Sequence, residues 1–125
     1  MESAVQGCRT VVLVEDEPIV RETAANLLVD DGCVVHAVTS HDEALEILRR
    51  DPHVTVVVTD IALAGTQTGL DLAEAVARHW PHLPIIILSG QVRPDIAELP
   101  GNALFCTKPY APGALTTLVR QCADW

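Results

Sequence analysis

The chain has 125 residues, of which 49% are hydrophobic and 20% are charged, and its formal net charge is −9. This length and apolar content suffice for one domain with a buried core, and no apolar stretch approaches the roughly 18 residues of a membrane-spanning helix. The excess of acids disfavours direct binding of a nucleic acid, and a polar start unlike a signal peptide leads us to expect a cytoplasmic protein without membrane insertion.

Hydrophobic periodicity predicts five strands that alternate with five helices. The predicted strands are residues 11–14, 33–38, 54–58, 85–88 and 103–106. The first helix begins at Pro18, because proline suits the first helical turn, and ends at residues 30–32 (DDG). Ser40 is the expected N-cap of the second helix, with Glu43 three residues later as in a capping box.

The remaining helices are predicted from apolar spacing and from the prolines that bound them. The third helix follows a loop at residues 65–69 and ends at Pro81. Only the residues between Pro94 and Pro100 can form the fourth helix, so we expect it to be shortened. The fifth helix has an apolar stripe formed by Leu115, Leu118, Val119 and Cys122.

This alternation predicts an α/β domain with a parallel sheet and helices on both faces, because parallel strands need crossover connections. Two strand orders are common for open sheets of this size. The order 2-1-3-4-5 of a flavodoxin-like, doubly wound (βα)5 fold makes the first and third strands neighbours, with the ligand crevice at their carboxyl ends. We expect this order in a domain of residues 9–125, preceded by a tail of residues 1–8.

Acidic residues follow the first and third predicted strands, and a lysine follows the last. In the order 2-1-3-4-5, Asp16 and Asp60 face each other. Ser89 then ends the adjacent fourth strand, and Lys108 reaches in from the fifth. Two carboxylates roughly 4 Å apart repel by about 4 kcal/mol at an effective dielectric constant near 20, and Glu15 adds a third acid. We expect the lysine and a Mg²⁺ ion, which prefers oxygen ligands, to compensate this charge.

Simpler structural explanations compete at several positions. An acid at a helix N-terminus stabilises the helix dipole, and we favour this explanation for Glu17 but reject it for Asp16 with Asp60. The four cysteines are isolated in the sequence, which indicates ordinary buried thiols rather than a zinc site or disulfides. A proline separates His79 from His82, so exposed histidines at a helix end are favoured over a metal site.

Four motifs, in this order, resemble those of the receiver domains of two-component response regulators, over roughly residues 9 to 123. They are VLVEDEP at residues 12–18, the apolar strand that ends in Asp60, LSG at residues 88–90, and Lys108-Pro109. The resemblance implies that Asp60 accepts a phosphoryl group from a histidine kinase or a histidine phosphotransfer protein. It also implies a Mg²⁺ or Mn²⁺ ion bound by Asp16, by Asp60 and by the backbone carbonyl of Ala62. Glu15 would act mainly through metal-bound water.

The same resemblance implies roles for further residues. Lys108 neutralises charge on the phosphoryl group, and the hydroxyl of Ser89 swings to bond a phosphoryl oxygen. Phe105 moves with Ser89, the alternative being a static core ring. Gln91 stands where the family tunes hydrolysis of the acyl phosphate, and the Lys108–Pro109 bond is expected to be cis. Such a protein is no enzyme toward other molecules, although it catalyses its own phosphorylation and dephosphorylation, and it signals to a downstream protein by changing conformation.

The chain also departs from the common receiver pattern. Ala64 stands where many receivers have proline, and Gly69 lies one residue further from Asp60 than the usual glycine. The segment from Ser89 to Lys108 is a few residues shorter than in a common receiver. That segment includes the fourth helix, so the usual surface for dimerisation and output is affected.

Other functional classes fit the sequence less well. A phosphatase with an aspartate nucleophile and a metal-dependent nucleic-acid enzyme both need a second acid where Ala62 stands. A flavin-binding module needs a phosphate cradle after the first strand, where this chain has acids. The main alternative is a receiver-like scaffold that is not phosphorylated. The joint presence of five polar site residues argues against it: Glu15, Asp16, Asp60, Ser89 and Lys108. We expect a single-domain regulator, with the receiver of a hybrid histidine kinase as the other possibility.

Overall fold

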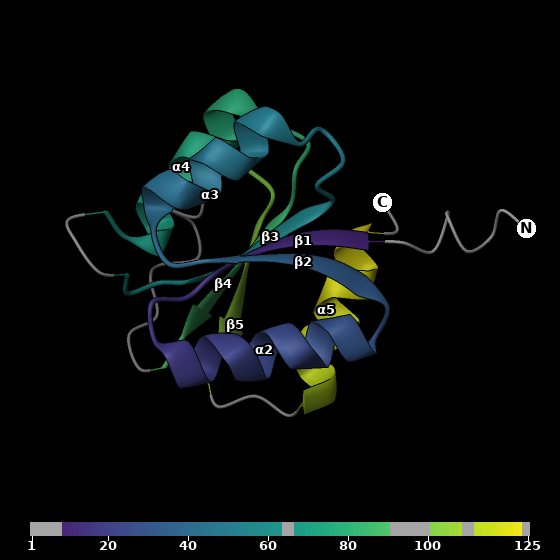
Figure 1. Ribbon diagram of the computed structural model, residues 1–125. Coiled ribbons are helices and arrows are strands. Elements are labelled where there is room, and N and C mark those ends of the chain that lie inside the picture. Colours follow the sequence, from purple (N-terminus) through teal and green to yellow (C-terminus); the bar gives the residue numbers. More distant parts are fainter. Residues whose placement is uncertain (1–8, 64–66, 91–100, 109–111, 124–125) are drawn as a thin grey trace, which may run out of the picture.

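The computed structural model describes residues 9–63, 67–90, 101–108 and 112–123, and within them a parallel sheet is covered by helices (Figure 1). The strands are β1 (Arg9–Val14), β2 (Cys33–Val38), β3 (Val56–Asp60), β4 (Ile85–Ser89) and β5 (Ala103–Thr107). The helices in the described residues are α2 (Pro18–Asp30), α3 (His41–Arg50), α4 (Gly69–His79) and α5 (Pro112–Ala123). None of these helices has both the length and the apolar character to cross a membrane.

The strand order is β2-β1-β3-β4-β5, which confirms the expected flavodoxin-like sheet. All neighbouring strands are parallel, and the chain switches direction across the sheet between β1 and β3. The register pairs Val14 with Thr59, and Asp60 with Leu88. The carboxyl ends of β1, β3 and β4 therefore meet at one edge of the sheet, which is where ligands bind in folds of this kind.

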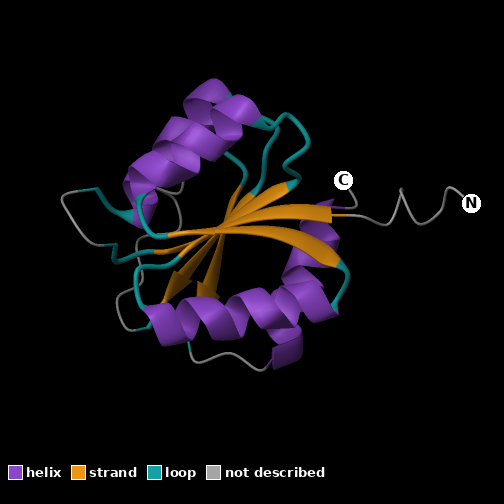
Figure 2. Cartoon of the chain, in the orientation of Figure 1, coloured by secondary structure: helices purple, strands orange, loops and turns teal. Residues whose placement is uncertain are grey.

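Two hydrophobic cores lie on the two faces of the sheet (Figure 2). Helices α2 and α5 cover one face, and α3 and α4 cover the other. Successive side chains of a strand point to opposite faces, so Leu13 enters the α2/α5 core while Val12 and Val14 enter the α3/α4 core. The central strands are buried on both faces, and each fully buried valine, leucine or isoleucine stabilises the fold by about 1.5–3 kcal/mol.

The helix ends follow the expected sequence signals in most cases. Helix α2 begins at Pro18 and is followed by Gly32, whose φ of +92° favours glycine. The hydroxyl of Ser40 accepts a hydrogen bond from the backbone N–H of Glu43, as expected for the N-cap of α3. Helix α4 has a full capping box between Thr68 and Asp71, which we did not predict. These caps set where α3 and α4 start on their side of the sheet.

Some predicted boundaries are shifted, and some expectations fall on residues that the structure does not describe. The third strand was expected at residues 54–58, but β3 runs from Val56 to Asp60. It extends beyond the apolar run because Thr59 and Asp60 also pair with β4. The shortened fourth helix and the cis peptide bond before Pro109 lie outside the described residues. The predicted ordinary, buried thiols are confirmed at three positions, none of which forms a disulfide among the described residues: Cys33, Cys106 and Cys122.

Candidate functional site

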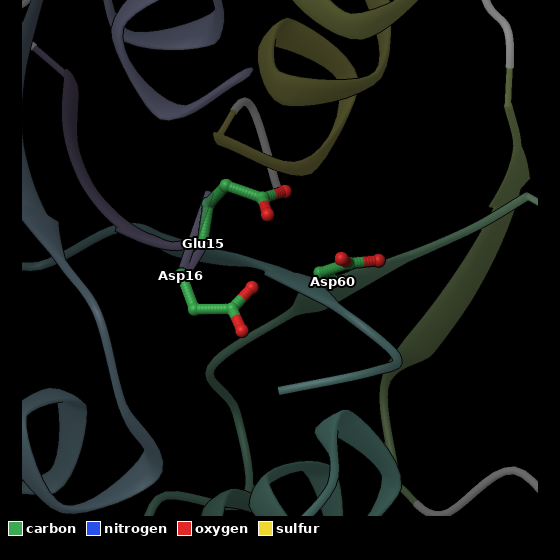
Figure 3. Close-up of side chains that lie close together, drawn as sticks. All are labelled: Glu15, Asp16 and Asp60. Carbon is green, nitrogen blue, oxygen red and sulfur yellow. The ribbon is translucent and has the colours of Figure 1, made fainter. Parts of the chain in front are cut away.

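Three carboxylates converge where β1 and β3 end (Figure 3). Glu15 and Asp16 follow β1 and leave the chain on opposite sides, and Asp60 is the last residue of β3. One carboxylate oxygen from each residue lies within 4.8 Å of the others. Glu15 is 3% exposed, whereas Asp16 and Asp60 are half-buried. The structure thus brings together the acids that the strand order predicted.

Backbone contacts hold the loop that carries Glu15 and Asp16. The N–H of Glu15 donates to the carbonyl oxygen of Val38 at 3.0 Å, which ties the loop to the end of β2. The guanidinium of Arg21 donates to the carbonyl oxygen of Glu15 at 2.9 Å. The Glu15 carboxylate itself accepts a hydrogen bond from the N–H of Glu17 at 3.2 Å. The loop is therefore anchored on both sides before any ligand binds.

Lys108 supplies the positive charge next to these acids. Its Nζ lies 3.3 Å from Asp60 Oδ1 and 3.5 Å from Glu15 Oε1. Its backbone N–H donates to the carbonyl oxygen of Ser89 at 2.7 Å, which fixes the start of the β5 loop against β4. The lysine reaches the site from the end of β5, as expected, and contacts both Glu15 and Asp60.

The charges of this site shift the pKa values of its members. Burial raises the pKa of Glu15, and the Asp60 carboxylate raises it further, against the N–H of Glu17 and the Lys108 ammonium. Burial alone would lower the pKa of Lys108, but the carboxylates of Asp60 and Glu15 outweigh it and raise that pKa. The shift of Lys108 reflects the neighbouring carboxylates, whereas that of Glu15 comes first from burial.

The three acids fit a divalent cation such as Mg²⁺. Their oxygens are hard ligands close enough to share one ion, and a single ammonium contacts two of them. Three carboxylates with one lysine leave a local charge of about −2, which a divalent ion would neutralise. The donor set and its charge therefore agree with the expected cofactor.

The other residues expected in the site are placed as follows. Ser89 is the last residue of β4, is 1% exposed, and pairs in register with Thr107 of β5. Phe105 lies on β5, half-buried against the α3/α4 core. Ala62 follows β3 with an exposed side chain. Gln91 lies outside the described residues.

Two further residues contact the backbone of Asp60 and were not among the expected site residues, although Gly69 had been compared with the usual glycine of the receiver pattern. The hydroxyl of Thr59 donates to the carbonyl oxygen of Asp60 at 2.9 Å. Gly69 packs so closely that a Cβ on it would lie 2.3 Å from the same oxygen. The sequence did offer a signal for Thr59, because it places a hydroxyl at the end of a buried apolar run, directly before the candidate nucleophile Asp60. For Gly69 the receiver pattern marks a glycine near this position, but its close approach to Asp60 depends on how the loop after β3 returns.

Comparisons with known proteins all point to one domain family. A family model described as the response regulator receiver domain matches residues 11–120. The chain is 30% identical over 121 residues to a putative NtrX-like response regulator of Rickettsia bellii and 31% identical over 116 residues to the response regulator protein FleR of Pseudomonas aeruginosa. It is 33% identical over 122 residues to the sensor kinase CckA of Brucella abortus. These matches cover 90–94% of this chain but 24%, 24% and 13% of the relatives, respectively.

Crystal structures with the same fold cover almost the whole chain. A response regulator receiver protein from Sinorhizobium medicae superposes with a TM-score of 0.86 at 28% identity, covering 95% of this chain and 97% of that one. A putative response regulator from Chloroflexus aurantiacus gives a TM-score of 0.80 at 26% identity, with 94% and 98% covered. The likeness of fold therefore extends over nearly all of the chain.

Proposed function

The chain belongs to the family of response regulator receiver domains, and we propose that it works as a phosphoacceptor in a two-component system, with Asp60 as the residue that is phosphorylated. The observation that carries this proposal is the position of Asp60, beside two other acids and 3.3 Å from the ammonium of Lys108. A carboxylate in that position lies next to a cation that can neutralise an incoming phosphoryl group.

The proposed reaction is an in-line phosphoryl transfer. A carboxylate oxygen of Asp60 attacks the phosphorus of a phosphohistidine, the P–N bond breaks, and the imidazole leaves with the electron pair of that bond. Such transfers depend mainly on positioning and charge neutralisation. Lys108 provides a point charge close to Asp60 for this purpose.

A divalent cation completes the proposed site. Mg²⁺ or Mn²⁺ would be held by Asp16, Asp60 and the carbonyl of Ala62, with Glu15 acting through water, and would neutralise charge on the phosphoryl oxygens. After transfer, we propose that the hydroxyl of Ser89 turns to bond a phosphoryl oxygen and that Phe105 moves with it. The added charge of about −1.5 to −2 is then the signal that changes the surface of the protein.

The proposed partners follow from the reaction class. The phosphoryl donor would be a histidine kinase or a histidine phosphotransfer protein, and the receptor of the signal would be a protein rather than a nucleic acid, given the charge of −9. The same proposal includes a cytoplasmic location and dephosphorylation that the protein catalyses itself, tuned by Gln91. It also includes a domain of residues 9–125 that follows a tail of residues 1–8. The alternatives are an unphosphorylated receiver-like scaffold and the receiver of a hybrid histidine kinase.

Intact-mass measurement tests the proposal. The protein is incubated with a small phosphodonor such as acetyl phosphate, with and without Mg²⁺, and compared with Asp60→Asn and with Asp42→Asn. Asp42 is a matched control because its carboxylate is exposed and lies outside the site. We expect a gain of one phosphoryl group that needs Mg²⁺, persists in Asp42→Asn and is absent in Asp60→Asn. No gain in the wild-type protein would support the scaffold instead.

A further inference from the structure

The peptide unit between Asp60 and Ile61 is held from several sides, by groups that do not belong to the acidic site. We propose that Thr59 and Gly69 form a clamp on this peptide, called the Asp60 clamp below, which sets the protein's affinity for the divalent cation. Thr59 is thereby a positioning residue. This inference rests on the proposed function, because it concerns how the proposed phosphoacceptor and its metal ligands are oriented.

The first side of the Asp60 clamp is the hydroxyl of Thr59. The side chain is fully buried, and by alternation with Val57 it points to the face of the sheet that α4 covers. Its Oγ1 donates to the carbonyl oxygen of Asp60 at 2.9 Å. A buried threonine hydroxyl needs a hydrogen-bond partner, and here that partner is the next residue's main chain.

The other side of the clamp comes from β4 and α4. The N–H of Ile61 donates to the carbonyl oxygen of Leu88 at 2.8 Å, so both polar groups of the Asp60–Ile61 peptide are engaged. The N–H of Gly69 donates to the carbonyl oxygen of Ile61 at 2.8 Å. A Cβ on Gly69 would lie 2.3 Å from the Asp60 carbonyl oxygen and 2.9 Å from Ile61 Cα. Only glycine lets the start of α4 approach the peptide this closely.

The clamp controls the direction in which the chain leaves β3. A peptide unit whose N–H and carbonyl are both bonded cannot rotate without breaking a hydrogen bond. The chain reaches Ala62, whose carbonyl is the proposed third metal ligand, directly after this fixed peptide. Groups that orient metal ligands typically contribute about 10–100-fold to metal affinity. Loss of the Thr59 hydroxyl should therefore weaken cation binding while leaving Asp60, Glu15 and Lys108 chemically unchanged.

Three variants test the clamp. Thr59→Val removes the hydroxyl at nearly constant shape, and Thr59→Ser keeps it. Thr55→Val is the matched control, because Thr55 also makes a hydrogen bond from a hydroxyl to a main-chain carbonyl, at 3.0 Å to Thr10, but at the opposite end of the sheet. The first readout is Mg²⁺ affinity by calorimetry, without phosphodonor. The second is amide hydrogen exchange at Ile61 and Gly69 in the metal-free protein.

We expect Thr59→Val to bind Mg²⁺ about tenfold more weakly and to exchange these two amides faster, while Thr59→Ser and Thr55→Val match the wild type. The phosphorylation rate of Thr59→Val should fall at low Mg²⁺ and recover to within about twofold at saturating Mg²⁺. If Thr59→Val does not fold, Thr59→Ser and Thr59→Ala are compared in the same way.

Equal Mg²⁺ affinity in the hydroxyl-free variant and the wild type would overturn the clamp. So would an equal loss in Thr59→Ser, which would assign the effect to side-chain volume. Failure of the proposed function gives a different result, because the wild-type protein itself would then not be phosphorylated at any Mg²⁺ concentration.

Discussion

The two ends of the sheet each carry a cluster of acidic and basic side chains, but the ratio of acids to bases is opposite. At the amino end, the single carboxylate of Asp31 is bonded by two nitrogens of Arg120, one at 2.9 Å, and lies 3.8 Å from Arg9. At the carboxyl end, three carboxylates lie near one ammonium, that of Lys108. The first cluster joins α2, β1 and α5 into one unit, while the second holds more carboxylates than cations among the residues that the structure describes.

The pKa shifts follow this difference. The hydrogen bond from Arg120 lowers the pKa of Asp31, and the charges of Arg120 and Arg9 lower it further. Burial among acids raises the pKa of Glu15 instead. The comparison teaches that an ion cluster which stabilises a fold has its charges balanced within the protein. A cluster with a surplus of one sign requires a ligand of the other sign, here a cation, to become balanced.

The largest expected effect comes from removing the cation that contacts the carboxylates at the acid-rich end, Lys108. Lys108→Ala should slow phosphorylation of Asp60 by about a hundredfold, because a group that neutralises transition-state charge typically contributes that much. The rate is measured by intact mass over time at saturating Mg²⁺. Arg120→Gln, at the balanced end, is the control and should leave the rate unchanged. A similar loss in both variants would show that the two ends are coupled through stability rather than separate in role.

A smaller effect is expected from packing at the acid-rich end. Gly69→Ala should lower the free energy of unfolding by about 1–3 kcal/mol, since the added Cβ meets the Asp60 main chain. Gly113→Ala, in the first turn of α5, has open space around its Cβ position and should be neutral or stabilising by up to about 1 kcal/mol. Urea unfolding of both variants measures the difference. Equal stabilities would contradict the close packing described for Gly69.

The smallest effects are opposite pH dependences at the two ends in metal-free protein. The pKa of Asp31 is lowered in the folded state, so its ion pairs stabilise the fold above its ordinary pKa of 3.8 and are lost as the pH falls through the folded pKa. Asp31→Asn should therefore lower the free energy of unfolding at pH 7 by at most about 1 kcal/mol. This deficit should disappear in acid.

Glu15 should show the reverse sign. Its pKa is raised in the folded state, so its charge destabilises the fold above that folded pKa, and the penalty is relieved as the pH falls toward its ordinary value of 4.5. Glu15→Gln should thus raise the free energy of unfolding at neutral pH, with the gain shrinking in acid. Denaturant unfolding from pH 3 to pH 8 measures both variants, and the same sign for both would refute the contrast between the two ends.

Much of the site could be predicted because its members are marked locally. Asp16, Asp60 and Lys108 each follow an apolar run, and the ends of parallel strands share one edge of the sheet. To predict that these charges meet, one further needs the strand order, and the alternation of strands and helices leaves two common orders. The meeting of these side chains was thus a prediction from topology, and the structure confirms their placement.

The contacts that hold the site in place could not be predicted in this way. The bond from Arg21 to the Glu15 carbonyl depends on how α2 leaves the loop, and the closeness of Gly69 depends on the return of the chain after β3. The end of β3 was misplaced for the same reason, since Thr59 and Asp60 belong to the strand through pairing with its neighbours, Thr59 with β1 and β4 and Asp60 with β4. Local pattern identifies reactive groups, whereas the main-chain contacts that orient them arise from tertiary packing.

The cation of the acid-rich end is also the only lysine in the sequence, among seven arginines. A reagent that acylates side-chain amines therefore has one target in this chain, and the raised pKa of Lys108 keeps that target protonated and slow to react. A divalent ion held by the carboxylates would withdraw the charge that raises this pKa. The rate of amine labelling at Lys108 would thereby report metal binding at the native side chain, without any substitution in the protein.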